Sequence, residues 1–270
     1  MSGETSRLIA ERLDLRYDDR VVVEGLDVAI PDDRFSVIVG PNACGKSTLL
    51  RALARILRPH AGRVLLDGRT IHSMPAKEVA RTLGMLPQSA VAPETITVLD
   101  LVGRGRFPHQ SLLRQWSDAD QQAVEQAMDA AGVTELAERP VDELSGGQRQ
   151  RAWLAMVLAQ QTEILLLDEP TTFLDITHQL DVLDLCADLR ADGYTIVAVL
   201  HDLNHAARYA DHLIAMADGR IVAAGTPEEV VTPELVAEVF GLACTVVPDP
   251  ATGTPMVVPA ARTRRTRLRH

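Results

Sequence analysis

The feature that most constrains this chain is a glycine-bounded loop between an apolar run and a helical pattern. The loop runs from residue 40 to residue 48 and fits G-x-x-x-x-G-K-[ST] at every fixed position. Residues 35–39 before it are predicted to form a buried strand, and residues 47–57 after it a helix. Backbone N–H groups of such a loop and the positive end of the helix both favour a polyanion. The sequence therefore predicts a site for a nucleoside triphosphate.

Two side chains of this phosphate loop have separate expected tasks. Lys46 can reach the β- and γ-phosphates, and the Ser47 hydroxyl can ligate Mg²⁺, a hard cation that prefers oxygen. The positions expected to surround the phosphates are Gly40, Pro41, Asn42, Ala43, Cys44, Gly45, Lys46, Ser47 and Thr48.

Composition bounds what surrounds this site. The 270 residues, 46% of them hydrophobic, suffice for one large α/β domain or for a domain with a sub-domain. The net charge of −10 argues against non-specific nucleic-acid binding.

Cys44, Cys186 and Cys244 show neither metal-ligand spacing nor a disulfide framework, which suits a reducing cytosol. No signal peptide and no membrane-spanning run is visible, so a role at a membrane would require a partner.

The hydrophobic pattern predicts an α/β nucleotide-binding core interrupted by a helical insert. Alternation over residues 8–30 indicates an antiparallel hairpin, and continuous apolar runs at 164–167 and 194–200 indicate central strands covered on both faces. Proline and arginine dominate the end of the chain, where a solvated tail or a contact with anionic lipid headgroups are the alternatives. The expected divisions are a core over about 1–88 and 161–247, a helical insert over about 89–160, and a flexible basic tail over 248–270.

Two adjacent carboxylates end the strand at residues 164–167. Asp168 and Glu169 would repel each other, and Mg²⁺ with a triphosphate is the expected counter-charge. Asp168 would hold the metal, directly or through water. Glu169 points the other way along the pleat and can polarise an attacking water as general base. The alternative is an acidic turn before Pro170.

A second phosphate cradle is predicted where another helix begins. Its residues are Ser145, Gly146, Gly147 and Gln148. Bare backbone N–H groups and a hydroxyl suit an anion there, although an ordinary serine-capped helix start has the same residues. One chain then carries two cradles and one complete set of metal ligands. The simplest arrangement that uses both cradles is a composite site, in which the cradle of one copy closes over the nucleotide bound by another copy.

These motifs, in this order and spacing, resemble those of the ATP-binding cassette (ABC) ATPases over nearly the whole chain. The resemblance implies the ABC ATPase fold, with a mixed-sheet core, an antiparallel β subdomain and an inserted helical subdomain. It implies that Tyr17 stacks on adenine, that Gln88 contacts Mg²⁺ and the attacking water, and that His201 contacts the γ-phosphate. Without the resemblance, His201 would be interpreted as structural.

The resemblance also implies a homodimer that binds ATP and Mg²⁺. Ser145 and Gly147 match groups that reach the γ-phosphate of the opposite subunit, and Asp175 matches a loop that communicates between the two sites. Ala43 departs from the Gly or Ser common in the family, and its methyl group is expected to be tolerated if φ is negative there. Cys44 lies near a helix N-terminus and Lys46, which lower thiol pKa values, so its alkylation is expected to block ATP binding.

Residues 98–110 closely resemble the corresponding segment of importers of ferric siderophores, haem and vitamin B12. Residues 171–180 and 201–209 favour siderophores. In such importers two ATPase subunits lie under two permease subunits at the cytoplasmic face of the membrane, and an external substrate-binding protein delivers the cargo. A short permease helix would lie in the groove between core and insert, against residues 98–110.

The resemblance leaves two further hypotheses about function open. The chain could serve a haem or cobalamin importer, or act as a soluble ATP-switched regulator without a permease. For the importers, charge substitutions at Leu101 or Phe107 are expected to uncouple transport while basal hydrolysis continues.

Overall fold

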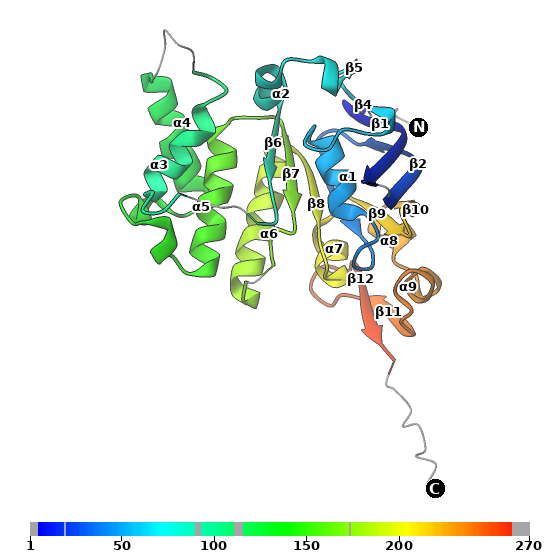
Figure 1. Ribbon diagram of the computed structural model, residues 1–270. Helices are drawn as coiled ribbons and strands as arrows, with labels where there is room; N and C mark the ends of the chain where they lie inside the picture. Colours follow the sequence, from blue (N-terminus) through cyan, green and yellow to red (C-terminus); the bar gives the residue numbers. More distant parts are fainter. Residues whose placement is uncertain (1–4, 19, 90–92, 111–115, 173, 261–270) are drawn as a thin grey trace, which may run out of the picture.

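The computed structural model describes residues 5–18, 20–89, 93–110, 116–172 and 174–260 (Figure 1). None of the helices in these ranges has both the length and the apolarity needed to span a bilayer. The last ten residues of the expected basic tail, 261–270, lie outside them.

A four-stranded antiparallel sheet, in the order β2-β1-β4-β5, carries the predicted N-terminal hairpin. Its strands are β1 (Leu8–Tyr17), β2 (Arg20–Ile30), β4 (Ala61–Leu66) and β5 (Arg69–Thr70). Leu8, Ala10, Leu13 and Leu15 of β1 are buried and pack toward α1 (Lys46–Leu53) and the central sheet. The apolar alternation in the sequence is therefore the buried face of this sheet.

The central sheet has six strands in the order β10-β9-β3-β8-β7-β6. All its pairings are parallel except that between β9 and β10. The strands are β3 (Phe35–Val39), β6 (Leu83–Leu86), β7 (Ile164–Asp168), β8 (Thr195–Val199), β9 (His212–Ala217) and β10 (Arg220–Gly225). Because β3, β7 and β8 run side by side in one direction, the segments that follow them meet at one edge of the sheet.

The hydrophobic core covers both faces of this central sheet. Val37 of β3 belongs to the cluster that includes the helical region, and the neighbouring Ile38 belongs to the cluster beneath the antiparallel sheet. Both are completely buried. The continuous apolar runs in the sequence follow from this double coverage.

Helices surround the sheet in two groups (Figure 1). The segment expected to form the helical insert contains α3 (Val98–Gly103), α4 (Asp118–Ala130) and α5 (Gly146–Ala159), which gather on one side of the molecule. A short 3-10 turn, η2 (Arg104–Arg106), continues α3. The others are α2 (Ala76–Thr82), α6 (Ile176–Ala191), α7 (Leu203–Tyr209), α8 (Pro227–Val230) and α9 (Pro233–Phe240).

The tail expected from residue 248 onward does not begin there. The structure has a hairpin of β11 (Cys244–Pro248) and β12 (Pro255–Pro259). Asn204 of α7 holds it, since its amide nitrogen donates to the carbonyl oxygen of Val257 (3.3 Å) and its oxygen accepts from the N–H of Val257 (2.7 Å). Pro248, Pro255 and Pro259 stand at strand ends of a two-stranded ribbon, where a missing N–H is tolerated, so proline content was a misleading signal of disorder.

Candidate functional site

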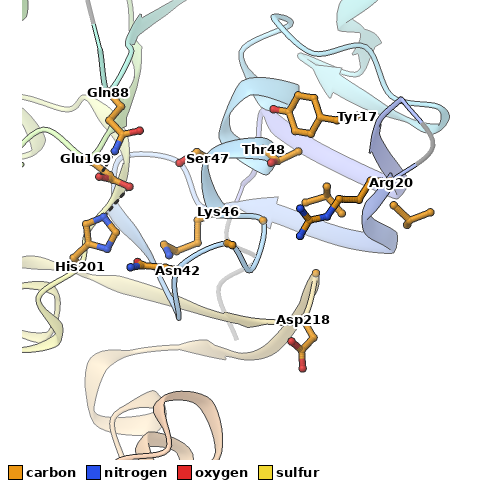
Figure 2. Close-up of a pocket in the computed structure, with 15 residues that line it drawn as sticks. Tyr17, Arg20, Asn42, Lys46, Ser47, Thr48, Gln88, Glu169, His201 and Asp218 are labelled. Atoms are coloured by element: carbon orange, nitrogen blue, oxygen red, sulfur yellow. Dashed lines mark hydrogen bonds and ion pairs between the residues drawn. The ribbon is translucent and has the colours of Figure 1, made fainter.

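The phosphate loop opens into a pocket of about 770 Å³ at the edge where β3, β7 and β8 end (Figure 2). The pocket brings together expected residues from segments far apart in the chain. These are Tyr17, Asn42, Ala43, Gly45, Lys46, Ser47, Thr48, Gln88, Glu169 and His201. The loop residues Gly40, Pro41 and Cys44 lie behind this lining.

The loop backbone packs closely against its neighbours and leaves the start of α1 uncapped by a side chain. Gly40 has φ +152°, and a Cβ atom there would lie 2.1 Å from the carbonyl oxygen of Met216. Gly45 caps α1 without a side chain, so the first-turn N–H groups of the helix are not covered by a capping hydroxyl or carboxylate. The ammonium group of Lys46 lies over the loop and donates to the carbonyl oxygens of Gly40 (2.9 Å) and Pro41 (2.8 Å). This arrangement suits a chain of phosphates.

The condition of a negative φ, under which the Ala43 methyl group was expected to be tolerated, is not met. Its φ is +62°, in the left-handed region that costs a residue with a Cβ atom about 1 kcal/mol. The loop therefore keeps its shape at Ala43 although glycine would adopt it with less strain.

The expected activation of Cys44 is also contradicted. Burial raises the pKa of the Cys44 thiol, and the opposing influences of Lys46 and of backbone N–H groups are smaller. The side chain is buried beneath the loop. The helix N-terminus and the nearby lysine were real signals, but desolvation outweighs them.

We therefore expect iodoacetamide at neutral pH to modify Cys244 well before Cys44. Cys244 lies on the C-terminal hairpin and is partly exposed, whereas the Cys44 thiol is buried and stays protonated. Mass spectrometry of peptides from the native protein measures both rates, with urea-unfolded protein as the control that equalises them. Faster labelling of Cys44 in the native protein would contradict this order.

Asp168 lies next to the loop serine at the end of β7. The Ser47 hydroxyl donates to its Oδ1 at 2.6 Å, and Arg51 lies 3.6 Å from its Oδ2. Burial raises the pKa of Asp168, while Ser47 and Arg51 act to lower it. Oδ2 is buried and has no hydrogen-bond partner. A serine hydroxyl beside a carboxylate whose second oxygen accepts no hydrogen bond is a donor set that suits Mg²⁺.

The described residues contain no cluster of three or more His, Cys, Asp or Glu side chains that could hold a metal. Mg²⁺ at phosphate-transfer sites usually takes one or two protein oxygens and completes its shell with water and substrate phosphates. The pair of Ser47 and Asp168 is therefore sufficient for that kind of site.

The carboxylate of Glu169 points into the pocket and is held by groups from three segments. His201 Nε2 lies 2.7 Å from Oε1, Gln88 Nε2 donates to Oε2 at 2.5 Å, and the Thr172 hydroxyl donates to Oε2 at 3.0 Å (Figure 2). The backbone at Glu169 has φ +55°. A strained, nearly buried carboxylate fixed on several sides is typical of a functional site.

Sequence reasoning missed two parts of the lining. Arg20 enters from the start of β2, close to Tyr17, and Asp218 and Gly219 enter from the β9–β10 turn. The Gly219 N–H donates to the carbonyl oxygen of Cys44 (3.0 Å), which joins that turn to the phosphate loop. The Asp-Gly turn was visible in the sequence, but nothing in the sequence indicated what it would contact.

The second cradle and Asp175 lie outside this pocket in the single chain. Ser145 caps α5 and forms a reciprocal capping box with Gln148, with contacts of 3.3 and 3.1 Å. Gly146 opens the same helix, and a Cβ atom on Gly147 would lie 2.6 Å from the ring of His178. Asp175 caps the neighbouring α6. The cradle therefore has the geometry of a serine-capped helix start and does not line the pocket of its own chain.

A second hollow, of about 560 Å³, lies within the helical region around residues 98–110. Phe107 and Trp116 border it, and 61% of the Phe107 surface is exposed. Leu101, in contrast, is only 1% exposed and belongs to the core. The expectation that a charge at Leu101 would merely uncouple transport is wrong, because a buried charge there would disrupt packing first.

A family model described as ABC transporter matches residues 23–172, more than half of the chain. The chain belongs to the ABC transporter family. It is an ABC transporter ATPase, and both the family and the fold expected from the resemblance are confirmed.

Relatives within the family are similar over almost their whole lengths. The ferric enterobactin transport ATP-binding protein FepC of Escherichia coli K12 is 56% identical over 264 residues, 97% of each protein. The petrobactin import ATP-binding protein FpuD of Bacillus anthracis is 52% identical over 261 residues, 96% of each. A solved inward-facing structure assigned to a metal-chelate type ABC transporter has a TM-score of 0.81 at 28% identity, covering 95% of this chain and 98% of that one.

Proposed function

We propose that this ABC transporter ATPase binds ATP with Mg²⁺ in the pocket around the phosphate loop and energises import of an iron–siderophore complex through a partner permease. The observation that supports hydrolysis is the position of the Glu169 carboxylate, which Gln88 and His201 contact. It lies across the pocket from Lys46 and Ser47 (Figure 2). Similarity to FepC and FpuD supports the class of cargo.

Hydrolysis at this site is mainly a matter of positioning and charge stabilisation. Lys46 and the loop N–H groups would bind the phosphates, and Tyr17, which also lines the pocket, would stack on the base. Ser47 and Asp168 would hold Mg²⁺, which supplies further neutralisation of phosphate charge when bound. Glu169 accepts a proton from the attacking water, and its contacts with Gln88 and His201 fix the carboxylate before substrate arrives.

Two copies are proposed to complete each other's sites. Ser145 and Gln148 begin α5 outside the lining of their own pocket, so the cradle would be available to a nucleotide held by a second chain. Asp175 caps α6, whose His178 packs against Gly147 of the cradle. Two ATP molecules would then close the dimer, and hydrolysis would release it and drive the permease.

Replacing Lys46 with alanine is expected to weaken ATP binding roughly ten- to a hundredfold. The ammonium group would lose charge-assisted hydrogen bonds to the phosphates, worth about 1.5–3 kcal/mol. Equilibrium binding of a fluorescent ATP analogue measures the effect. The only other lysine, Lys77, is the matched control, and its alanine variant should bind as the parent protein does. Equal affinity in the Lys46 and Lys77 variants would remove Lys46 from the site.

Replacing Phe107 with aspartate is expected to reduce transport at least tenfold while basal ATP hydrolysis stays within about twofold. The exposed ring borders the hollow proposed as the permease contact, so a charge there would oppose docking without reaching the nucleotide pocket. Uptake in cells and ATPase activity of the purified chain measure the two quantities. Val222→Asp, on an exposed position of β10, controls for surface charge. Unchanged uptake in the Phe107 variant would rule out this contact.

The cargo is tested by uptake in cells that have or lack this chain. Iron–siderophore complexes, haem and cobalamin are supplied separately, and proteins that co-purify with the tagged chain from solubilised membranes are identified. Siderophore uptake that requires the chain, together with a co-purified multispanning permease, supports the proposal. If only haem uptake or only cobalamin uptake required the chain, that compound would be the cargo in place of a siderophore. If no membrane protein co-purified, the soluble-regulator hypothesis would be favoured.

A further inference from the structure

Positive charge is concentrated on the face formed by the end of α1, the β4–β5 hairpin and α2. Residues 55–81 contain six arginine or lysine residues and two acidic ones, in a chain whose net charge is −10. Both acidic side chains are already paired, Asp67 with Arg7 and Glu78 with Arg69. The segment therefore carries a surplus of positive charge that its own carboxylates do not neutralise.

Four of these cations have no carboxylate within salt-bridge distance in the described part of the chain. Two guanidinium groups instead donate to backbone carbonyl oxygens at 2.9 Å, Arg55 to Met74 and Arg81 to Pro108. A carbonyl satisfies a hydrogen bond but does not cancel a charge. We name these residues the cationic strip: Arg55, Arg58, Lys77 and Arg81.

A cavity of about 310 Å³ adjoins the strip and is lined by Arg58, His60, Arg63, Thr70 and His72, among others. The Nε2 atom of His72 is buried and has no hydrogen-bond partner. Burial lowers the pKa of His72, and the charges of Arg55 and Arg58 act in the same direction. The cavity is therefore bordered by positively charged groups, which favour an anionic oxygen.

An exposed apolar side chain stands among these cations. Ile56 follows the last turn of α1, lies between Arg55 and Arg58 in sequence, and is 64% exposed. Aliphatic side chains flanked by arginine are typical of surfaces that rest in the interfacial layer of a bilayer.

The strip is continuous with the hollow proposed as the permease contact. Lys77 and Arg81 of α2 donate to the carbonyl oxygens of Gln110 and Pro108, in the segment that carries Phe107. Figure 1 places α2 and β5 at one end of the molecule and α9 and β11 at the other. A permease seated on the Phe107 hollow would therefore leave the strip beside it, facing the surface of the same membrane.

We propose that the cationic strip, with Ile56, docks on anionic phospholipid headgroups of the membrane that holds the permease. This inference rests on the proposed function, because it needs that membrane to be the site of action. Each basic side chain near an anionic bilayer contributes about 1 kcal/mol of binding, so two of them correspond to about thirtyfold in affinity.

The test is co-sedimentation of the full chain with vesicles, which needs no permease and no cargo. Vesicles of equal parts phosphatidylglycerol and phosphatidylcholine are compared with vesicles of phosphatidylcholine alone. The variant Arg58→Gln/Lys77→Gln removes two charges of the strip. Arg139→Gln/Arg208→Gln removes two exposed charges elsewhere and gives the same net charge. Basal ATP hydrolysis without vesicles confirms that both variants are folded.

We expect binding to the anionic vesicles only, about thirtyfold weaker for the strip variant and within about threefold of the parent for the control. Equal weakening of both variants would assign binding to net charge, and no weakening of either would assign it to another part of the chain. Normal vesicle binding by a strip variant that fails to co-purify with the permease would assign the strip to that protein. Each of these results overturns the inference. Failure of siderophore uptake, with vesicle binding intact, would overturn the proposed cargo instead.

Discussion

Replacing Glu169 with glutamine is expected to lower ATP hydrolysis by about 10²- to 10⁴-fold while ATP still binds. The amide keeps the size of the carboxylate but cannot accept a proton from water, and a positioned general base contributes about that factor. Contacts of the side chain with Gln88 and Thr172 can persist through the amide, so the pocket should keep its shape. The closed ATP-bound dimer should therefore accumulate, since opening depends on hydrolysis.

Phosphate release, ATP affinity and size-exclusion chromatography with ATP measure the three parts of this expectation. Glu125→Gln, on the exposed face of α4, is the matched control and should hydrolyse ATP normally. Turnover of the Glu169 variant close to that of the control would show that Glu169 is not the base. Slow turnover without a stable dimer would leave the base in place and remove the proposed composite site.

Replacing Asp120 with alanine is expected to destabilise the protein by about 3–5 kcal/mol, because it strands a buried guanidinium group. Arg106 and Asp120 are both buried. Arg106 donates to Asp120 Oδ1 (2.9 Å), to the carbonyl oxygen of Ala159 (2.7 Å) and to the side-chain oxygen of Gln161 (2.9 Å). This one side chain thus joins η2, α4 and the end of α5.

Urea unfolding followed by tryptophan fluorescence measures this loss directly, since both tryptophans, Trp116 and Trp153, lie in the helical region. Asp118→Ala, at an exposed position in the first turn of the same helix, should cost about 1 kcal/mol or less. Similar losses in the two variants would mean that the buried pair contributes little beyond helix-end electrostatics.

The same pair predicts a pH dependence of stability. Burial acts to raise the pKa of Asp120, but hydrogen bonds from Ser117 and Arg106 and the charge of Arg106 outweigh it, so its pKa lies below the ordinary 3.8. A carboxyl group with a lowered folded-state pKa stabilises the protein above its unfolded-state pKa. That contribution is lost as pH falls below about 3.8 through the folded-state pKa. Asp120→Ala should lack this component of acid sensitivity.

Much of the nucleotide site could be predicted because its parts are contiguous in the chain. The phosphate loop needs only a strand, a glycine-bounded turn and a helix start, and the local sequence of residues 35–57 predicts all three. Asp168 and Glu169 follow a run that had to be a central strand, so their place at the sheet edge followed from alternation and length. The resemblance to ABC ATPases added Gln88 and His201, whose surroundings in sequence are uninformative.

The predictions that were wrong concern properties set by neighbours distant in sequence. Desolvation beneath the antiparallel sheet keeps the Cys44 thiol protonated, and the packing of the helical region buries Leu101. The C-terminal hairpin is held by Asn204, more than fifty residues before the strand it contacts. Neither periodicity nor composition contains such contacts.

The sequence by itself determined the family, the phosphate loop and the order of strands and helices, because local backbone preference and apolar periodicity are properties of neighbouring residues. Only the tertiary structure decided which distant groups meet. It placed the β9–β10 turn against the phosphate loop, set Gln88 and His201 on the Glu169 carboxylate, and gathered the cationic strip on one face. The physical reason is that burial, hydrogen bonding and charge depend on distance in space, which the folded chain alone fixes.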